Sequence, residues 1–122
     1  MLPHSFPTTF GSKNEQNVYY ALTRYEIDFD YQVPIFGGRL QRGGLVLDFL
    51  VRNPFDIAVP VGKGGYWHRS YMSSEEQYAL GVLIERFQGR VVALTEEETD
   101  TYEEAEDAVR TWIVERPGAS KY

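Results

Sequence analysis

The spacing of apolar residues near the N-terminus is that of a helix with one buried face. These residues recur three or four positions apart, at Val18, Ala21, Leu22 and Tyr25. The spacing predicts a helix over 12–25. Ser12 and Glu15 stand at the two positions of a capping box, which is typical of a helix start. Residues 1–11 contain two prolines and a glycine, and we expect an extended lead-in there.

Three extended segments follow this helix. Apolar and polar residues alternate over 27–36, which predicts a strand with Pro34 at a sheet edge or a bulge. Residues 45–51 are apolar except for Asp48, and this pattern predicts a strand that is buried on both faces. Residues 56–61 come after an Asn-Pro turn signal and predict a third strand.

The second half of the chain returns to a helical pattern. An apolar stripe predicts a helix over 74–88, and a glycine then separates it from a short strand over 90–94. A last helix is predicted over 101–115. The order α-β-β-β-α-β-α in 122 residues predicts one α/β domain over 12–115, followed by a tail over 116–122.

The composition is that of a packed globule and restricts the available chemistry. Hydrophobic residues make up 43% of the chain and aromatic residues 15%, which argues against a disordered chain. Cysteine is absent, so disulfides, thiol nucleophiles and thiolate metal sites are excluded. No apolar run is long enough to span a bilayer, and the first residues lack the layout of a signal peptide. We therefore expect a cytoplasmic protein without a membrane partner.

The charge is negative overall but unevenly spread. A net charge of −6 argues against non-specific binding of nucleic acid, which needs cations near phosphates. Residues 72–122 hold twelve acidic and five basic residues, whereas residues 1–71 hold six acidic and seven basic residues. The first part contains five closely spaced cations, Arg39, Arg42, Arg52, Lys63 and Arg69. These cations form either a local basic face or a set of ordinary solvated charges.

Two carboxylates of the predicted elements are candidates for chemistry. Asp48 lies inside an apolar strand, where a carboxylate is costly to bury unless it is paired or bound to a metal. The alternative to a functional role is that Asp48 faces solvent at a strand edge or is paired with Arg39, Arg42 or Arg52. Glu15 extends the buried face of the first helix, so it is a second candidate. Its alternative is the ordinary role of a capping-box partner for Ser12.

A histidine follows the third predicted strand and a glycine-rich loop. His68 comes directly after Tyr66-Trp67, and near neutral pH a histidine can act as a general base or acid. Its alternative is a solvent-facing position at the end of an aromatic cluster. Glu75 and Glu76 open the next predicted helix and can reach the same area, although helix starts favour acids for electrostatic reasons alone.

Four pieces of the chain occur in the order of a known family. They are Glu15 in the first helix, Asp48 before a Phe in an apolar strand, the strand over 57–61, and the ending Tyr66-Trp67-His68. On these pieces, residues 12–94 resemble the PD-(D/E)xK nuclease superfamily. The resemblance is closest to the branch of very-short-patch repair and EDxHD homing endonucleases.

The resemblance implies a fold, a metal and a set of roles. The implied fold is a restriction-endonuclease-like α-β-β-β-α-β core with a C-terminal helix. In the family the Asp binds Mg²⁺, while the Glu and His help to activate water and handle the leaving group. These roles fall to Asp48, Glu15 and His68, with Glu15 also near the metal and Glu75 or Glu76 as a supporting acid. DNA contacts are then expected from the cations Arg39, Arg42, Lys63 and Arg69.

The third predicted strand departs from the family pattern. Most members carry an acid and a lysine there, whereas this chain reads Val59-Pro60-Val61. The very-short-patch branch tolerates this loss because a backbone carbonyl can bind the metal, and Pro60 offers a carbonyl. The resemblance implies a Mg²⁺-dependent DNA endonuclease or nickase. Because the domain is small, we expect a homodimer or a protein partner to supply specificity.

A second hypothesis keeps the fold without the chemistry. The missing acid, the acidic charge and the small size favour a catalytically degenerate nuclease fold. Such a domain would serve as a structural or protein-binding module of a phage or other mobile element, in a virion or phage-associated location. Fold alone does not fix function, so the sequence leaves both hypotheses open.

Overall fold

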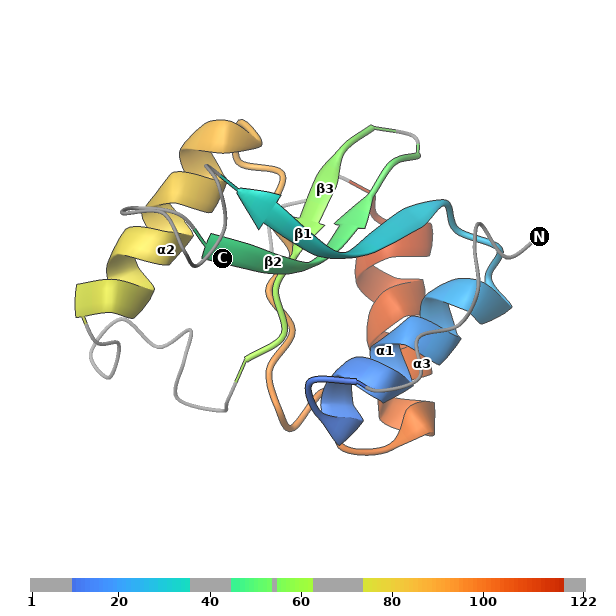
Figure 1. The fold of residues 1–122 in the computed structure, drawn as a ribbon. Helices are drawn as coiled ribbons and strands as arrows, with labels where there is room; N and C mark the ends of the chain where they lie inside the picture. The colour runs from blue at the N-terminus through green and yellow to red at the C-terminus, as the bar shows by residue number, and fades with distance from the viewer. Residues whose placement is uncertain (1–9, 36–44, 54, 63–73, 118–122) are drawn as a thin grey trace.

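A computed structural model describes residues 10–35, 45–53, 55–62 and 74–117 of the chain (Figure 1). The described part is a small α/β domain. In chain order its elements are α1 (Lys13–Arg24), β1 (Phe29–Ile35), β2 (Leu45–Val51), β3 (Ile57–Val59), α2 (Ser74–Arg86), α3 (Tyr102–Val109) and the π-helical segment η3 (Arg110–Val114). Within these residues no helix is both long and apolar enough to cross a membrane.

The three strands form one antiparallel sheet in the order β1-β2-β3. β2 lies in the middle, where Phe49 pairs with Tyr31 of β1 and Val59 of β3. The predicted strand over 45–51 is confirmed, and its second half is almost wholly buried because both faces of the sheet are covered. Pro34 lies in the outer strand β1, as predicted, where its missing N–H is tolerated.

The predicted strand over 90–94 does not form as a regular strand. Two isolated parallel bridges join Ala58 to Val91 and Val61 to Leu94. Backbone N–H groups donate in both directions between the segments, from Ala58 to the Arg90 carbonyl at 3.0 Å and from Leu94 to the Pro60 carbonyl at 2.9 Å. Proline lacks the N–H that a continuous ladder needs at position 60, so the pairing is divided into two bridges.

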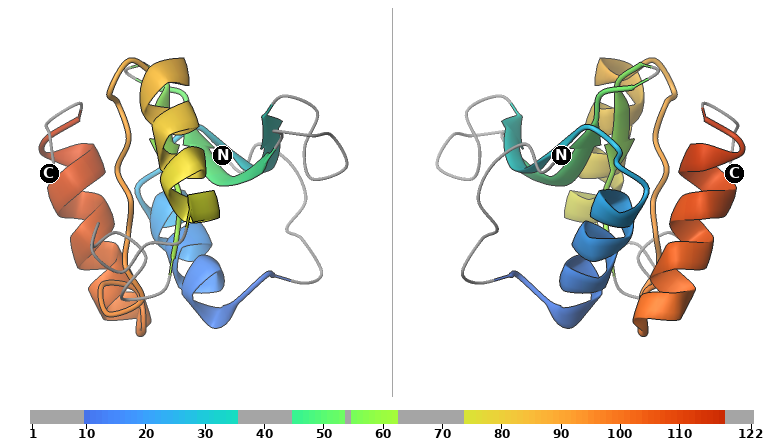
Figure 2. Two further views of the ribbon diagram at one scale, coloured as in Figure 1. Left: turned by 90° about the vertical axis from the view of Figure 1, so that its left-hand side faces the viewer. Right: turned by 90° about the vertical axis from the view of Figure 1, so that its right-hand side faces the viewer.

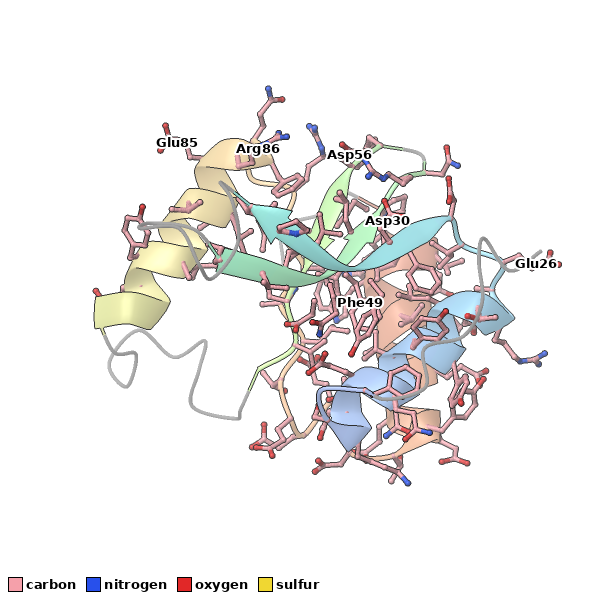
Figure 3. All side chains as sticks on the ribbon, in the orientation of Figure 1. Glu26, Asp30, Phe49, Asp56, Glu85 and Arg86 are labelled. Atoms are coloured by element: carbon pink, nitrogen blue, oxygen red, sulfur yellow. The ribbon has the colours of Figure 1, made fainter. Side chains whose placement is uncertain are left out.

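The helices cover the two faces of the sheet (Figures 1 and 2). α1 and α3 pack together on one face, and their buried cluster includes the strand residues Phe29, Phe49, Val51, Ile57 and Val59. α2 packs on the other face, in a cluster that includes Leu50, Ala58, Leu83, Phe87 and Val91. Phe49 lies centrally among the side chains (Figure 3). The sheet is therefore a layer between two helical layers, which explains its apolar sequence.

The C-terminal helix differs from its prediction in its last turn. An α-helix was expected over 101–115, but regular α-helix ends at Val109 and a π-helical turn follows. The N–H of Glu115 donates to the carbonyl of Arg110 at 2.8 Å, five residues back. Ile113 remains buried within this wider turn.

Two asparagines of α1 bind the loop before α3. Nδ2 of the buried Asn17 donates to the Thr99 carbonyl at 2.8 Å, and Nδ2 of Asn14 donates to the Thr99 hydroxyl at 2.9 Å. Thr99 is itself fully buried. These bonds satisfy polar groups inside the domain and fasten the loop to the helix.

We expect Asn17→Ala to lower the free energy of unfolding by about 1–3 kcal/mol, because it leaves the buried Thr99 carbonyl without this donor. Asn14→Ala is the matched control, since Asn14 is only half-buried and solvent can replace its bonds. Urea unfolding of both variants measures the difference. Equal stabilities for the two variants would show that the Asn17 bond does not hold the loop.

Candidate functional site

The structure describes two of the three predicted catalytic residues, Glu15 and Asp48. The other predicted residues that lie outside the described ranges are His68 and the cations Arg39, Arg42, Lys63 and Arg69. Glu75 and Glu76 belong to the first turn of α2. The geometry of the candidate site is therefore that of the two carboxylates and their neighbours.

Glu15 combines a helix cap with contacts to the sheet. Its backbone N–H donates to Oγ of Ser12 at 3.1 Å, which confirms Ser12 as the N-cap of α1. Its Oε1 accepts hydrogen bonds from Oη of Tyr31 at 2.9 Å and from Nε2 of Gln32 at 3.1 Å. Its Oε2 accepts from Oγ of Ser12 at 3.3 Å. In a simple capping box the glutamate bonds to the cap backbone, so the β1 contacts are an addition to that role.

Tyr31 is held between Glu15 and the chain before α1. Its hydroxyl donates to Glu15 and accepts the N–H of Gly11 at 3.1 Å. Burial raises the pKa of the Tyr31 hydroxyl, and the Glu15 carboxylate adds to this rise while the Gly11 N–H opposes it. The hydroxyl therefore stays protonated near neutral pH and remains a donor. A Cβ on Gly11 would lie 2.6 Å from Oε2 of Glu15, so the glycine leaves room for the carboxylate.

Gln32 has an unusual backbone conformation for a residue inside a strand. Its φ is +59°, in the left-handed region that side chains other than glycine and asparagine rarely adopt. Glu26 and Gln88 have similar values, but they follow the ends of α1 and α2, where this conformation is common. Gln32 instead lies in the middle of β1, where the side chain contacts Glu15. Strained backbone of this kind is frequent at functional sites.

Asp48 lies in β2, the strand that pairs with β1. Tyr31 pairs with Phe49 and Val33 pairs with Leu47, and Gln32 and Asp48 are the residues between these two pairs. The half-buried Asp48 carboxylate accepts the backbone N–H of Val61 at 2.8 Å through Oδ2. This bond holds the chain that leaves β3 against β2.

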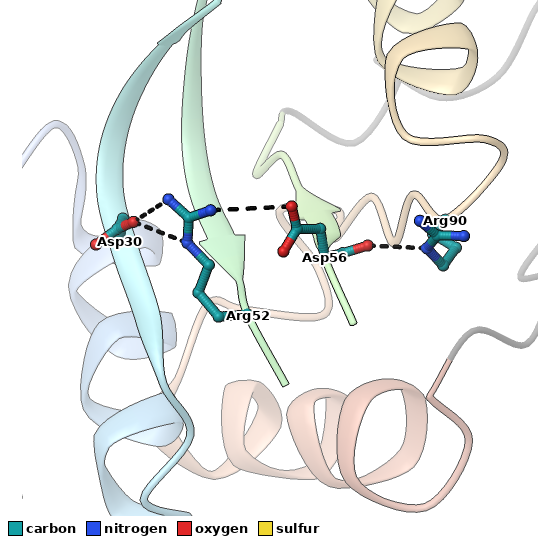
Figure 4. A network of polar contacts seen from close by, with 4 residues as sticks. All are labelled: Asp30, Arg52, Asp56 and Arg90. Atoms are coloured by element: carbon teal, nitrogen blue, oxygen red, sulfur yellow. Dashed lines mark hydrogen bonds and ion pairs between the residues drawn. The ribbon is translucent and has the colours of Figure 1, made fainter. Parts of the chain in front are cut away.

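Arg52, one of the predicted cations, directly follows the last residue of β2 and is part of a polar network there (Figure 4). Its Nε and Nη2 donate to Oδ2 of Asp30 at 3.0 and 2.5 Å, and its Nη1 lies 3.8 Å from Oδ2 of Asp56. Nε of Arg90 donates to the Asp56 carbonyl at 3.1 Å. The hydrogen bond to Asp30 raises the pKa of Arg52. These groups are substantially exposed, so the network adds little to stability.

Glu15 and Asp48 are the two predicted metal ligands whose side chains the structure describes. Across the described ranges, no group of three or more His, Cys, Asp and Glu side chains is arranged to hold a metal ion. The Pro60 carbonyl, predicted as a further ligand, accepts the N–H of Leu94. A bound divalent ion would therefore need oxygen ligands from water or substrate in addition to the two carboxylates.

Tyr31 and Gln32 were not singled out by the sequence. Tyr31 follows the alternation of an ordinary strand residue, and its contact with Glu15 depends on how α1 packs on β1. The left-handed backbone of Gln32 has no signal in its residue type, because glycine or asparagine is usual there. Comparison of the chain with protein-family models, curated proteins and solved structures gave no significant match.

Proposed function

We propose that this protein is a metal-dependent DNA endonuclease or nickase of the very-short-patch/EDxHD type. One observation carries this proposal: the acid of α1 is bonded to β1, the strand that pairs with the middle strand, where the second acid lies. Glu15 accepts a hydrogen bond from the Gln32 side chain, and Gln32 and Asp48 are the residues between the register pairs Tyr31–Phe49 and Val33–Leu47. Carboxylates are the protein ligands that Mg²⁺ commonly takes, and a bound divalent ion can assist phosphodiester cleavage.

The order of the elements supports a restriction-endonuclease-like core for this function. β1, β2 and β3 form an antiparallel meander, and the chain then passes through α2 before residues 91–94 return parallel to the end of β3. α1 carries Glu15 on the face opposite α2, and α3 supplies the C-terminal helix. The order agrees with the α-β-β-β-α part of such a core, and two parallel bridges stand where its last strand is expected.

Mg²⁺ suits the two carboxylates. It is commonly bound by one or two protein carboxylates, with waters and substrate phosphates completing the coordination. Glu15 and Asp48 would hold it, and each carboxylate is oriented by hydrogen bonds from its neighbours. When bound, the ion would act as a Lewis acid that activates water and stabilises charge on the phosphate.

The remaining roles belong to residues outside the described ranges and to Glu76 of α2. We assign proton transfer to His68, support to Glu76, and phosphate contacts to the cations Arg39, Arg42, Lys63 and Arg69. The described C-terminal part is acidic, with exposed carboxylates at Glu96, Glu97, Glu103, Glu104 and Asp107. DNA would therefore approach from the opposite, less acidic side, and a homodimer or protein partner would add specificity.

Plasmid nicking tests this function. We expect purified protein to convert supercoiled plasmid to nicked or linear forms in Mg²⁺ or Mn²⁺, and to leave it intact in EDTA. Asp48→Asn, purified by the same procedure, controls for a contaminating nuclease. Intact plasmid at every metal concentration, with circular dichroism showing folded protein, would contradict the endonuclease function.

A degenerate nuclease fold that serves as a structural or protein-binding module is the second candidate. A specific observation favours it: each predicted ligand position already has a partner within the chain. Glu15 accepts three hydrogen bonds from side chains, Asp48 accepts the Val61 N–H, and the Pro60 carbonyl accepts the Leu94 N–H. Under this hypothesis the melting temperature would not respond to Mn²⁺, whereas a metal site predicts a rise that saturates with concentration.

A further inference from the structure

We propose that Gln32 is a positioning residue whose left-handed backbone directs its amide to Glu15 and holds that carboxylate against β1. The positioning itself is a property of the described contacts. Its effect on cleavage rests on the proposed endonuclease function. The resemblance to the nuclease superfamily implies roles for acidic, basic and histidine residues. It implies none for Gln32, whose contribution depends on backbone conformation.

The backbone of Gln32 is the first reason. A left-handed residue inside a strand is unfavourable for any side chain with a Cβ, and glycine would remove the strain. The chain nevertheless has glutamine there. Its side chain makes a 3.1 Å bond through Nε2 to Oε1 of Glu15. The strain therefore accompanies a contact that glycine could not make.

The surroundings of Glu15 are the second reason. Its three side-chain donors come from the helix cap and from two successive residues of β1: Ser12, Tyr31 and Gln32. All three donors are uncharged, so they fix the direction of the carboxylate without neutralising it. Gly11 lies close to the same carboxylate and leaves it room, since a Cβ there would meet Oε2 at 2.6 Å. A carboxylate that is oriented in this way remains attractive to a cation.

The location of Gln32 is the third reason. Gln32 and Asp48 are the residues that lie between the register pairs Tyr31–Phe49 and Val33–Leu47. The residue that orients one candidate metal ligand thus belongs to the strand that pairs with the strand of the other. Groups that orient metal ligands in this way typically change metal affinity or activity by about 10–100-fold when they are removed.

Two substitutions at Gln32 separate the amide from the backbone strain. Gln32→Gly and Gln32→Ala both remove the side-chain amide that donates to Glu15. Only glycine adopts the left-handed region without steric strain. We expect both variants to nick plasmid about 10–100-fold more slowly and to need about tenfold more Mg²⁺ for half-maximal rate. We expect the melting temperature of the glycine variant to exceed that of the alanine variant by roughly 2–6 °C.

Gln88 provides a matched control from the same chain. It is also a left-handed glutamine, but it is exposed and follows α2. Gln88→Gly should leave the Mg²⁺ midpoint and the nicking rate unchanged. A wild-type Mg²⁺ midpoint in the folded Gln32→Gly enzyme would overturn the effect on cleavage, even though the nuclease itself is active.

A double-mutant cycle tests the positioning without any need for catalysis. Gln32→Gly and Glu15→Ala are made singly and together, and their melting temperatures are compared. If Gln32 holds Glu15, glycine at position 32 should raise the melting temperature more in the Glu15→Ala background, where no bond to Glu15 is lost. Additive effects would overturn the positioning role. Coupled effects in a protein that cleaves no DNA would support the positioning and contradict only the endonuclease function.

Discussion

Asp48→Asn should leave the protein folded while reducing metal-dependent nicking by roughly 100- to 1,000-fold. Asparagine is nearly isosteric with aspartate and keeps a side-chain oxygen that can accept the Val61 N–H, which the native carboxylate binds at 2.8 Å. It removes the negative charge that a divalent ion needs. Nicking rates over a range of Mg²⁺ concentrations, together with melting curves, measure the two effects separately.

Asp48→Ala is the partner variant for this prediction. It removes the acceptor as well as the charge, so we expect it to lose about 1–3 kcal/mol of unfolding free energy in addition to activity. If both variants are inactive and the asparagine variant is more stable than the alanine variant, Asp48 has both a structural and a chemical role. Full nicking by the asparagine variant would exclude Asp48 as a metal ligand. Equal stability of the two variants would show that the Val61 N–H finds another acceptor.

Phe49→Ala should lower the free energy of unfolding by about 3–5 kcal/mol, which is the largest loss that we expect from any substitution named here. Phe49 is fully buried in the middle strand, and its ring centroid lies 5.1 Å from that of Tyr31 and 5.9 Å from that of Phe29. Alanine would leave a cavity at the junction of α1 and the sheet. Native domains typically have only about 5–15 kcal/mol of stability, so this loss is a large share. Urea unfolding monitored by tyrosine and tryptophan fluorescence measures it.

Two control variants define what this result means. Phe49→Leu keeps most of the apolar volume and should cost clearly less than alanine. Ile84→Ala changes an apolar side chain that is 41% exposed on α2, and we expect it to cost much less. If Phe49→Ala were no worse than Ile84→Ala, Phe49 would not be a core residue. Because Phe49 contacts Tyr31, the alanine variant should also loosen the groups around Glu15.

Local patterns were sufficient for the start of the first helix and for the middle strand. The start of α1 follows from Ser12, because a cap is satisfied within one turn of its own residue. β2 coincides with the predicted 45–51 because a strand that is covered on both faces is largely apolar. These features depend on residues a few positions apart, so the sequence carries them directly.

The pairing beyond β3 depended on contacts between distant segments. Residues 90–94 have the composition of a strand, but their partner is a chain segment about 30 positions earlier. That partner contains Pro60, whose missing N–H limits the pairing to two bridges. Composition therefore indicated an extended segment, whereas the partner decided how much regular strand could form.

The sequence by itself determined the order of the elements and the presence of one acid in α1 and one in β2. The tertiary structure decided how the α1 acid is held. Glu15 is oriented by Tyr31 and Gln32, which belong to another element, and the left-handed backbone of Gln32 is not encoded in any local residue preference. Side-chain direction at a site depends on the packing of several elements at once, and local patterns do not contain that information.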